Sequence, residues 1–169
     1  MLYFITGGER SGKSSYAQKL ALSLSTDPVY VATARVWDND FENRIERHQK
    51  ERDDRWTNFE EEKYISRLDL KNKVVVIDCV TLWLTNFYLD TKYKVEESLK
   101  HAKWEFDKLI LIDASIIVIS NEIGMGVHAD TEIGRKFVEL QGWMNQYIAS
   151  KATTAILMVS GIPITIKGH

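Results

Sequence analysis

The most informative sequence in this chain is Gly7-Gly8-Glu9-Arg10-Ser11-Gly12-Lys13-Ser14. It matches the pattern G-x-x-x-x-G-K-[ST] and stands between the apolar run Leu2–Ile5 and an amphipathic segment, Ser14–Leu24. With a strand before it and a helix after it, this pattern forms a phosphate-binding loop, the P-loop. Glycine permits the backbone angles that turn N–H groups toward an anion, and the helix adds its positive N-terminal end. We therefore expect all eight residues to bind nucleotide, with Lys13 as a catalytic residue on the β- and γ-phosphates and Ser14 on Mg²⁺.

Short apolar runs recur along the chain and indicate strands. None alternates strictly with polar residues, which is typical of strands covered on both faces of a parallel sheet. They are Leu2–Ile5, Val29–Ala32, Val74–Ile77, Ile116–Ile119 and Ala155–Val159. The last run, Ile162–Ile166, contains Pro163 and therefore indicates an edge strand or a tail.

The segments between the runs have the composition of helices. Ser14–Leu24 repeats its apolar residues with a period of 3.6, and Thr131–Ser150 carries a long apolar stripe. The predicted helices are Ser14–Leu24, Asp38–Asp54, Val80–Leu89, Val95–Ile112 and Thr131–Ser150. This alternation predicts one α/β domain over residues 1–169, a P-loop NTPase-like three-layer sandwich with a mainly parallel sheet.

Composition limits the classes of partner. The chain has 169 residues, with 24 acidic against 22 basic side chains and a net charge of −2, so we expect no nucleic-acid partner. The one cysteine, Cys79, cannot form an internal disulfide, which fits a reducing compartment. No apolar run is long enough for a membrane span. We expect a cytoplasmic protein.

Polar residues follow several of the predicted strands. Asp78 ends the run Val74–Ile77, where an acid can hold Mg²⁺ together with Ser14. Thr33-Ala34-Arg35, Ser120-Asn121-Glu122 and Ser160-Gly161 follow the other runs. Since ligands of open α/β sheets bind at the carboxyl ends of the strands, we expect these groups to meet at one edge.

His48 lies in a highly charged segment. Arg44 precedes it by four residues, and Arg52 and Arg55 follow it by four and seven, so all of them share one face of a helix. Guanidinium groups would keep the imidazole neutral and would stabilise phosphoryl charge. Spacing alone nevertheless favours a solvated charged helix with an incidental histidine, because charge runs are usually surface.

Eight blocks follow one another over nearly the whole chain. They are Gly7–Ser14, Tyr30–Ala34, Arg44–His48, Trp56-Thr57, Asp78–Asn86, Ser120–Gly126, Asn145-Gln146 and Val159–Pro163. Together they resemble the bifunctional adenosylcobinamide kinase / adenosylcobinamide-phosphate guanylyltransferase family of cobalamin assembly.

The resemblance implies two reactions. An NTP (ATP or GTP) phosphorylates the aminopropanol hydroxyl of adenosylcobinamide, and GTP then transfers GMP to the adenosylcobinamide phosphate. It also implies that His48 carries GMP as a covalent intermediate and that the enzyme is a homotrimer. The nucleotide contacts that it implies outside the P-loop are Thr33, Ala34, Arg35, Gln49, Lys50, Glu51, Arg52, Glu60 and Asp78.

Two other functions stay open from the residues alone. One is a plain P-loop small-molecule kinase in which His48 takes no part. The other is a nucleotide-dependent switch protein, although the chain lacks the N-K-x-D signature of switch GTPases. Covalent modification of His48 would separate the bifunctional enzyme from the plain kinase.

Overall fold

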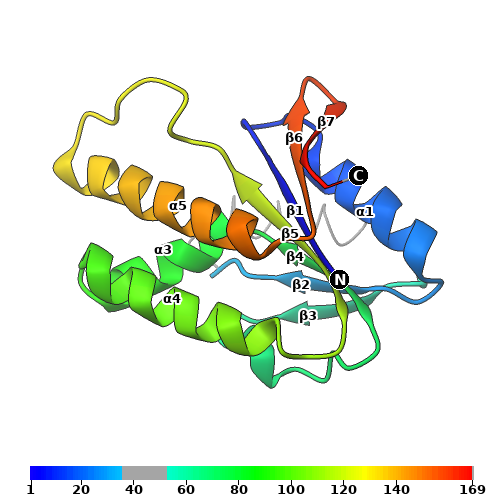
Figure 1. Ribbon diagram of the computed structural model, residues 1–169. Coiled ribbons are helices and arrows are strands. Elements are labelled where there is room, and N and C mark those ends of the chain that lie inside the picture. The colour runs from blue at the N-terminus through cyan, green and yellow to red at the C-terminus, as the bar shows by residue number, and fades with distance from the viewer. Residues whose placement is uncertain (36–52, 169) are drawn as a thin grey trace.

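A computed structural model describes residues 1–35 and 53–168. The described residues form one sheet of seven strands in the order β3-β2-β4-β5-β1-β6-β7 (Figure 1). The strands are β1 (Leu2–Gly7), β2 (Val29–Ala32), β3 (Thr57–Glu60), β4 (Val74–Asp78), β5 (Ser115–Asn121), β6 (Thr154–Val159) and β7 (Ile162–Lys167). The helices are α1 (Lys13–Leu24), α3 (Val80–Asp90), α4 (Val95–Leu109), α5 (Glu132–Lys151) and the short 3₁₀ helix η1 (Ile65–Arg67).

Six of these strands run parallel, and only the edge strand β7 is antiparallel to its neighbour, β6. The register places Gly7 beside Asn121 and Ala32 beside Asp78. The last residues of the parallel strands therefore lie along a single border of the sheet, which we call the carboxyl edge. The predicted α/β fold with a mainly parallel sheet is confirmed.

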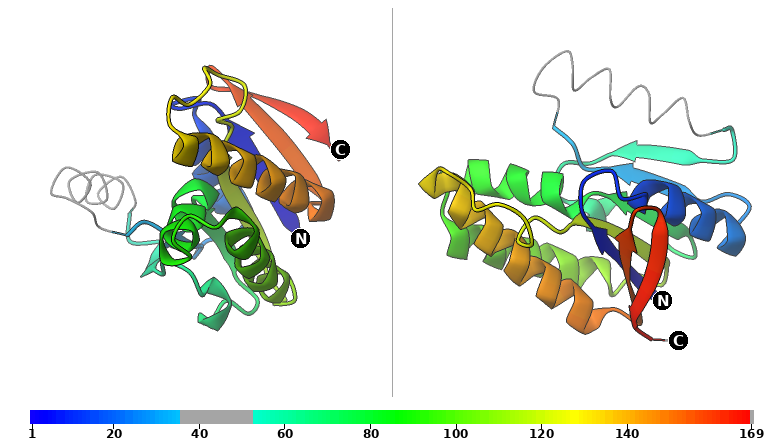
Figure 2. Two further views of the ribbon diagram at one scale, coloured as in Figure 1. Left: turned by 90° about the vertical axis from the view of Figure 1, so that its left-hand side faces the viewer. Right: turned by 90° about the horizontal axis from the view of Figure 1, so that it is seen from above.

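Helices cover both faces of the sheet (Figure 2). One apolar cluster joins Ile5 and Val76 to Ala17 of α1, and the other joins Phe4 to Trp83 of α3 and to residues of α4 and α5. Neighbouring residues of β1 thus belong to opposite layers, which explains why the strand shows no alternation of apolar and polar residues. None of the described helices has the length and hydropathy needed to cross a membrane.

The predicted strands are all present, and Ile162–Ile166 falls in a strand rather than a tail. The sequence did not indicate β3, whose four residues Thr57–Glu60 are mostly polar and exposed. The helix predicted to end at Ile112 stops at Leu109, because Leu111 and Ile112 form turns back to Lys108 and Leu109.

The helix predicted over Asp38–Asp54 lies outside the described residues except for its last two. Asp53 and Asp54 are not helical. The carboxylate of Asp53 instead accepts hydrogen bonds from the backbone N–H and the guanidinium of Arg55. Such local bonds compete with helical ones, so this end of the prediction was wrong.

Candidate active site

The P-loop turns sharply between β1 and α1. Gly12 has a φ of +94°, a left-handed conformation that glycine adopts without strain, and α1 begins at the next residue, Lys13. The carbonyl of Gly12 accepts the first helical hydrogen bond from the Tyr16 N–H at 3.0 Å. The N-terminus of α1 therefore faces the loop, as anion binding requires.

Two neighbouring strands hold the P-loop through backbone hydrogen bonds. The Glu122 N–H, just after β5, donates to the Gly7 carbonyl at 3.0 Å. The Gly161 N–H, in the turn between β6 and β7, donates to the Ser11 carbonyl at 2.9 Å. The segments after β5 and β6 thus meet the P-loop at the carboxyl edge, as the sequence predicted.

Lys13 lies inside the loop rather than in solvent. Its side chain is 7% exposed, and its Nζ donates a hydrogen bond of 2.6 Å to the Gly8 carbonyl. Burial lowers the pKa of the Lys13 ammonium, and the negative charge of Glu9 acts in the opposite direction. The ammonium is positioned to exchange one carbonyl contact for phosphate oxygens.

Ser14 and Asp78 meet although 64 residues separate them. The Ser14 hydroxyl donates to Asp78 Oδ2 at 2.9 Å, and the Tyr30 hydroxyl donates to the same oxygen at 2.5 Å. A hydroxyl and a carboxylate are oxygen ligands of the kind that Mg²⁺ takes beside nucleotide phosphates, so the pair fits that ion. Among residues 1–35 and 53–168, no group of three or more His, Cys, Asp or Glu side chains could hold a metal by itself.

Thr33 joins the ends of β2 and β4. Its buried hydroxyl donates to the Cys79 carbonyl at 2.8 Å and accepts from the Cys79 N–H at 2.9 Å. Its own N–H donates to the Asp78 carbonyl at 3.0 Å. Burial raises the pKa of the Cys79 thiol to about 12, so this thiol is not a nucleophile at neutral pH.

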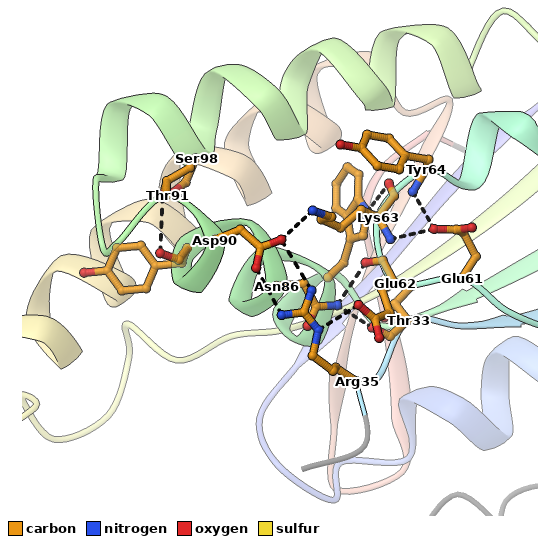
Figure 3. A network of polar contacts seen from close by, with 12 residues as sticks. Thr33, Arg35, Glu61, Glu62, Lys63, Tyr64, Asn86, Asp90, Thr91 and Ser98 are labelled. Atoms are coloured by element: carbon orange, nitrogen blue, oxygen red, sulfur yellow. Dashed lines mark hydrogen bonds and ion pairs between the residues drawn. The ribbon is translucent and has the colours of Figure 1, made fainter.

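Four ionised side chains, which we call the charged group, lie beyond β2 (Figure 3). Arg35 Nε donates to Glu62 at 2.7 Å, and Arg35 Nη1 donates to Asp90 at 3.1 Å. Lys63 also pairs with Asp90. These hydrogen bonds raise the pKa of Arg35 and lower that of Asp90 to about 2. The guanidinium of Arg35 is thus held between two carboxylates at the carboxyl edge.

Side chains of helix α3 bond to the backbone next to and within the charged group. Asn86, which is fully buried, donates from Nδ2 to the Thr33 carbonyl at 2.8 Å and to the Glu62 carbonyl at 2.9 Å (Figure 3). Trp83 Nε1 donates to the Lys63 carbonyl at 2.8 Å. The segments that follow β2 and β3 are therefore fixed to one helix.

The three adjacent acids after Phe59 have different surroundings. Glu60 is exposed at the carboxyl end of β3, beside Ala32. Glu61 accepts the N–H groups of Lys63 and Tyr64, and Glu62 pairs with Arg35. Glu60 therefore ends a strand at the carboxyl edge, and Glu61 and Glu62 lie in the segment that follows it.

The structure brings together only part of the predicted site. It places the P-loop residues, Thr33, Ala34, Arg35, Glu60 and Asp78 along the carboxyl edge. His48 and the predicted nucleotide contacts Gln49, Lys50, Glu51 and Arg52 lie outside the described residues.

Sequence reasoning missed Lys63 and Asp90 as neighbours of the predicted site, because they are charged residues of an ordinary kind that no spacing pattern distinguishes. It chose Glu60 among the adjacent acids Glu60, Glu61 and Glu62, and it noticed Tyr30 only as the first residue of the block Tyr30–Ala34. Asn86 was noticed only as the last residue of the block Asp78–Asn86 that carried the resemblance.

Comparison with known proteins decides the family. The family model described as "Cobinamide kinase / cobinamide phosphate guanyltransferase" (CobU) matches residues 3–166. The chain belongs to this family. It is therefore a bifunctional enzyme of adenosylcobalamin biosynthesis that acts on cobinamide as a kinase and on cobinamide phosphate as a guanylyltransferase.

Full-length relatives agree with this assignment. The "Bifunctional adenosylcobalamin biosynthesis protein CobU" of Escherichia coli is 33% identical over 184 residues, covering 99% of this chain and 100% of that protein. The corresponding CobP of Pseudomonas aeruginosa is 34% identical, covering 98% and 96%. Flagellar accessory protein FlaH of Methanocaldococcus jannaschii is similar at a TM-score of 0.48 and 16% identity, covering 99% of this chain and 78% of that one, a likeness too low to bear on function.

Proposed function

We propose that residues 1–169 form one domain that carries out both family reactions at the carboxyl edge. In the first reaction, ATP or GTP phosphorylates the aminopropanol hydroxyl of adenosylcobinamide. In the second, GMP passes from GTP to the new phosphate through His48. The observation that carries the proposal is the joint placement of buried Lys13, in the P-loop, and the Ser14–Asp78 pair beside it.

In this proposal, the P-loop residues Gly7 to Ser14 bind the triphosphate. Their N–H groups and the N-terminus of α1 neutralise phosphate charge. The Lys13 ammonium stabilises the negative charge that develops on the transferred group. Ser14 and Asp78 would hold Mg²⁺, which supplies further charge neutralisation on the phosphates. Tyr30 orients the carboxylate of Asp78 through its hydrogen bond.

The nucleotide contacts outside the P-loop rest on the resemblance. We propose that Thr33, Ala34, Arg35, Gln49, Lys50, Glu51, Arg52, Glu60 and Asp78 line the GTP site. For the described members, the support is their common place at the carboxyl edge, where the P-loop also lies. Because Asn86 fixes the segment that contains Thr33, that segment is rigid before a nucleotide arrives.

His48 is the proposed nucleophile. A neutral imidazole nitrogen attacks the α-phosphorus of GTP, a nitrogen–phosphorus bond forms, and the bond to pyrophosphate breaks. An oxygen of the cobinamide phosphate then attacks the same phosphorus and releases His48, giving the GDP-linked product. A covalent intermediate divides one difficult transfer into two easier steps.

The test is retention of label on the denatured protein. Wild type, His48→Ala and the matched control His101→Ala, whose histidine is exposed on α4, are each incubated with Mg²⁺ and GTP labelled at the α-phosphate. We expect an acid-labile, alkali-stable label on wild type and on His101→Ala but none on His48→Ala. A wild type that binds GTP without retaining label would contradict the role of His48 and leave only the kinase reaction.

We also propose that the enzyme is a homotrimer in the cytoplasm. The support for an oligomer is an apolar row on the edge strand β7, where Ile162, Ile164 and Ile166 are 64%, 46% and 58% exposed. The single buried cysteine, Cys79, supports a reducing compartment. Sedimentation should give the mass of three chains. Ile164→Lys should dissociate them, whereas Thr165→Lys, on the alternate face of the strand, should not.

A further inference from the structure

Two surfaces of different chemistry lie at the carboxyl edge. The charged group, formed by Arg35, Glu62, Lys63 and Asp90, lies beyond β2. Residues 122–131 follow β5, the strand next to β1; they join it to α5 and reach the P-loop at their first residue, Glu122. We call residues 122–131 the β5–α5 loop; in Figure 1 it is the yellow loop above α5.

Hydrogen bonds hold both ends of the β5–α5 loop. At its start, the Glu122 N–H is bonded to the Gly7 carbonyl, and the Glu122 carboxylate accepts from the Gly124 N–H at 2.7 Å. At its end, Arg135 Nη1 donates to the carbonyls of Ala129 at 3.2 Å and Asp130 at 2.9 Å. The two ends of the loop are therefore fixed, and the first of them is bonded to the P-loop.

Apolar side chains occupy the part of the loop between the anchors. Met125 is 81% exposed and Val127 is 96% exposed. An apolar side chain leaves water favourably, so two of them together on an anchored loop form a surface suited to an apolar ligand. The thioether of methionine also adapts its shape to varied partners.

The family substrate supplies the matching chemistry. Cobinamide is a broad corrin macrocycle whose conjugated ring and methyl groups are apolar, with carboxamides around its rim and one flexible arm that ends in the reacting hydroxyl. That hydroxyl must come close to the terminal phosphate held by Lys13 and the P-loop. The macrocycle is too large to enter the loop itself, so it must rest on a surface that borders it. The charged group would lose hydration under an apolar face at a free-energy cost, whereas Met125 and Val127 would gain by burial.

We propose that the tip of the β5–α5 loop, at Met125 and Val127, is the contact surface for the corrin face of cobinamide. The loop places the macrocycle beside the P-loop so that the arm reaches the transferred phosphate, while the charged group stays with the nucleotide. The inference deepens the proposed function and rests on its kinase step. It does not depend on the covalent role of His48.

The experiment compares substrate binding in three proteins: wild type, the double variant Met125→Ser/Val127→Ser, and Leu111→Ser. Leu111 is 84% exposed in the turn between α4 and β5, at the opposite edge of the sheet, and is the matched control. Equilibrium dialysis with cobinamide, followed by its visible absorbance, gives Kd, and kinase assays give the KM of each substrate. We expect the double variant to raise both the Kd and the KM for cobinamide about tenfold, from the loss of two apolar contacts.

The same variant should leave the KM for ATP and the histidine label from GTP unchanged, and Leu111→Ser should match wild type throughout. The apolar variant Met125→Leu/Val127→Ile should bind cobinamide like wild type. An unchanged cobinamide Kd in the double variant overturns the inference. A change in sedimenting mass without a change in Kd also overturns it, because the loop would then belong to a contact between copies. Failure of wild type to phosphorylate cobinamide would instead contradict the proposed function.

Discussion

At one half of the carboxyl edge, Arg35 lies between two carboxylates, and α3 fixes the backbone around it. At the other half, hydrogen bonds anchor the two ends of the β5–α5 loop, which carries Met125 and Val127 at 81% and 96% exposure. The strand order produces this separation, because the charged group follows β2, β3 and α3, the loop follows β5, and β4 lies between β2 and β5. In the proposed arrangement, the charged group contacts the nucleotide and the β5–α5 loop contacts the macrocycle, so one P-loop serves both ligands.

We expect the largest effect from a change in the P-loop, which both halves of the carboxyl edge share. Lys13→Met should lower kcat of the kinase reaction by about 10²–10³-fold, because a preorganised positive charge on the transferred phosphate is lost. Histidine labelling by GTP should fall as well, since both reactions use one triphosphate site. Steady-state kinetics with cobinamide and ATP would measure the first effect.

The control is Lys19→Met, which removes an equal charge from an exposed position on α1. It should keep wild-type kinetics. If Lys13→Met lost only one of the two activities, the claim of a single triphosphate site would be wrong, because each reaction would then have its own phosphate site.

Asn86 tests the rigidity of the charged half. Asn86→Ala leaves the buried Thr33 carbonyl and the partly buried Glu62 carbonyl without the Asn86 donor, so the free energy of unfolding should fall by about 2–3 kcal/mol. The KM for GTP should rise while the Kd for cobinamide stays constant. Urea unfolding and dialysis measure the two effects, with Gln146→Ala, an exposed amide on α5, as the control. An equal loss of affinity for both substrates would argue against independent halves.

Gly12 lies where the P-loop touches the β6–β7 turn. An alanine there would keep a φ of +94°, which costs about 1–2 kcal/mol, and its Cβ would lie 3.2 Å from Gly161 Cα. Gly12→Ala should therefore weaken ATP binding and lower the Tm. Gly142→Ala is the matched control, because Gly142 lies within α5 with no neighbour within 4 Å of the new Cβ. That change should raise the Tm through helix propensity, and a similar fall in both variants would refute the strain argument.

Most of the fold could be predicted because its signals are local. The pattern Gly7–Ser14 and the apolar runs that form buried strands each lie within a few consecutive residues. Strand β3 could not be predicted, since Thr57–Glu60 is short, mostly polar and paired on one side only, with β2. Its stability comes from a neighbouring strand rather than from its own composition.

The site was predictable to the extent that one sequence pattern contains it. Gly7 to Ser14 follow from the pattern, and Asp78 from its position at the end of an apolar run. The partners of Arg35 could not be predicted in this way. Glu62 is 27 residues away and Asp90 is 55 residues away, so only the fold brings them together. The role of His48 came from the family resemblance and stays a proposal.

Asp90 gives the smallest effect, and its sign can be worked out. Arg35 and Lys63 lower its pKa from 3.8 to about 2, so its folded carboxyl releases a proton more readily than the unfolded one. The ion pairs therefore stabilise the fold fully above about pH 4, and this contribution disappears as the pH falls toward 2. Because the carboxylate is 37% exposed, Asp90→Asn should cost less than about 1 kcal/mol at pH 7.

The difference in unfolding free energy between wild type and Asp90→Asn should shrink in 1 M salt and between pH 4 and pH 2, since screening and protonation both remove the attraction. Asp69→Asn, at an exposed position before β4, supplies the control for a general charge effect. Asp90→Asn should also shift the KM for GTP more than the Kd for cobinamide. A larger shift for cobinamide would place the macrocycle on the charged half and reverse the assignment of the two surfaces.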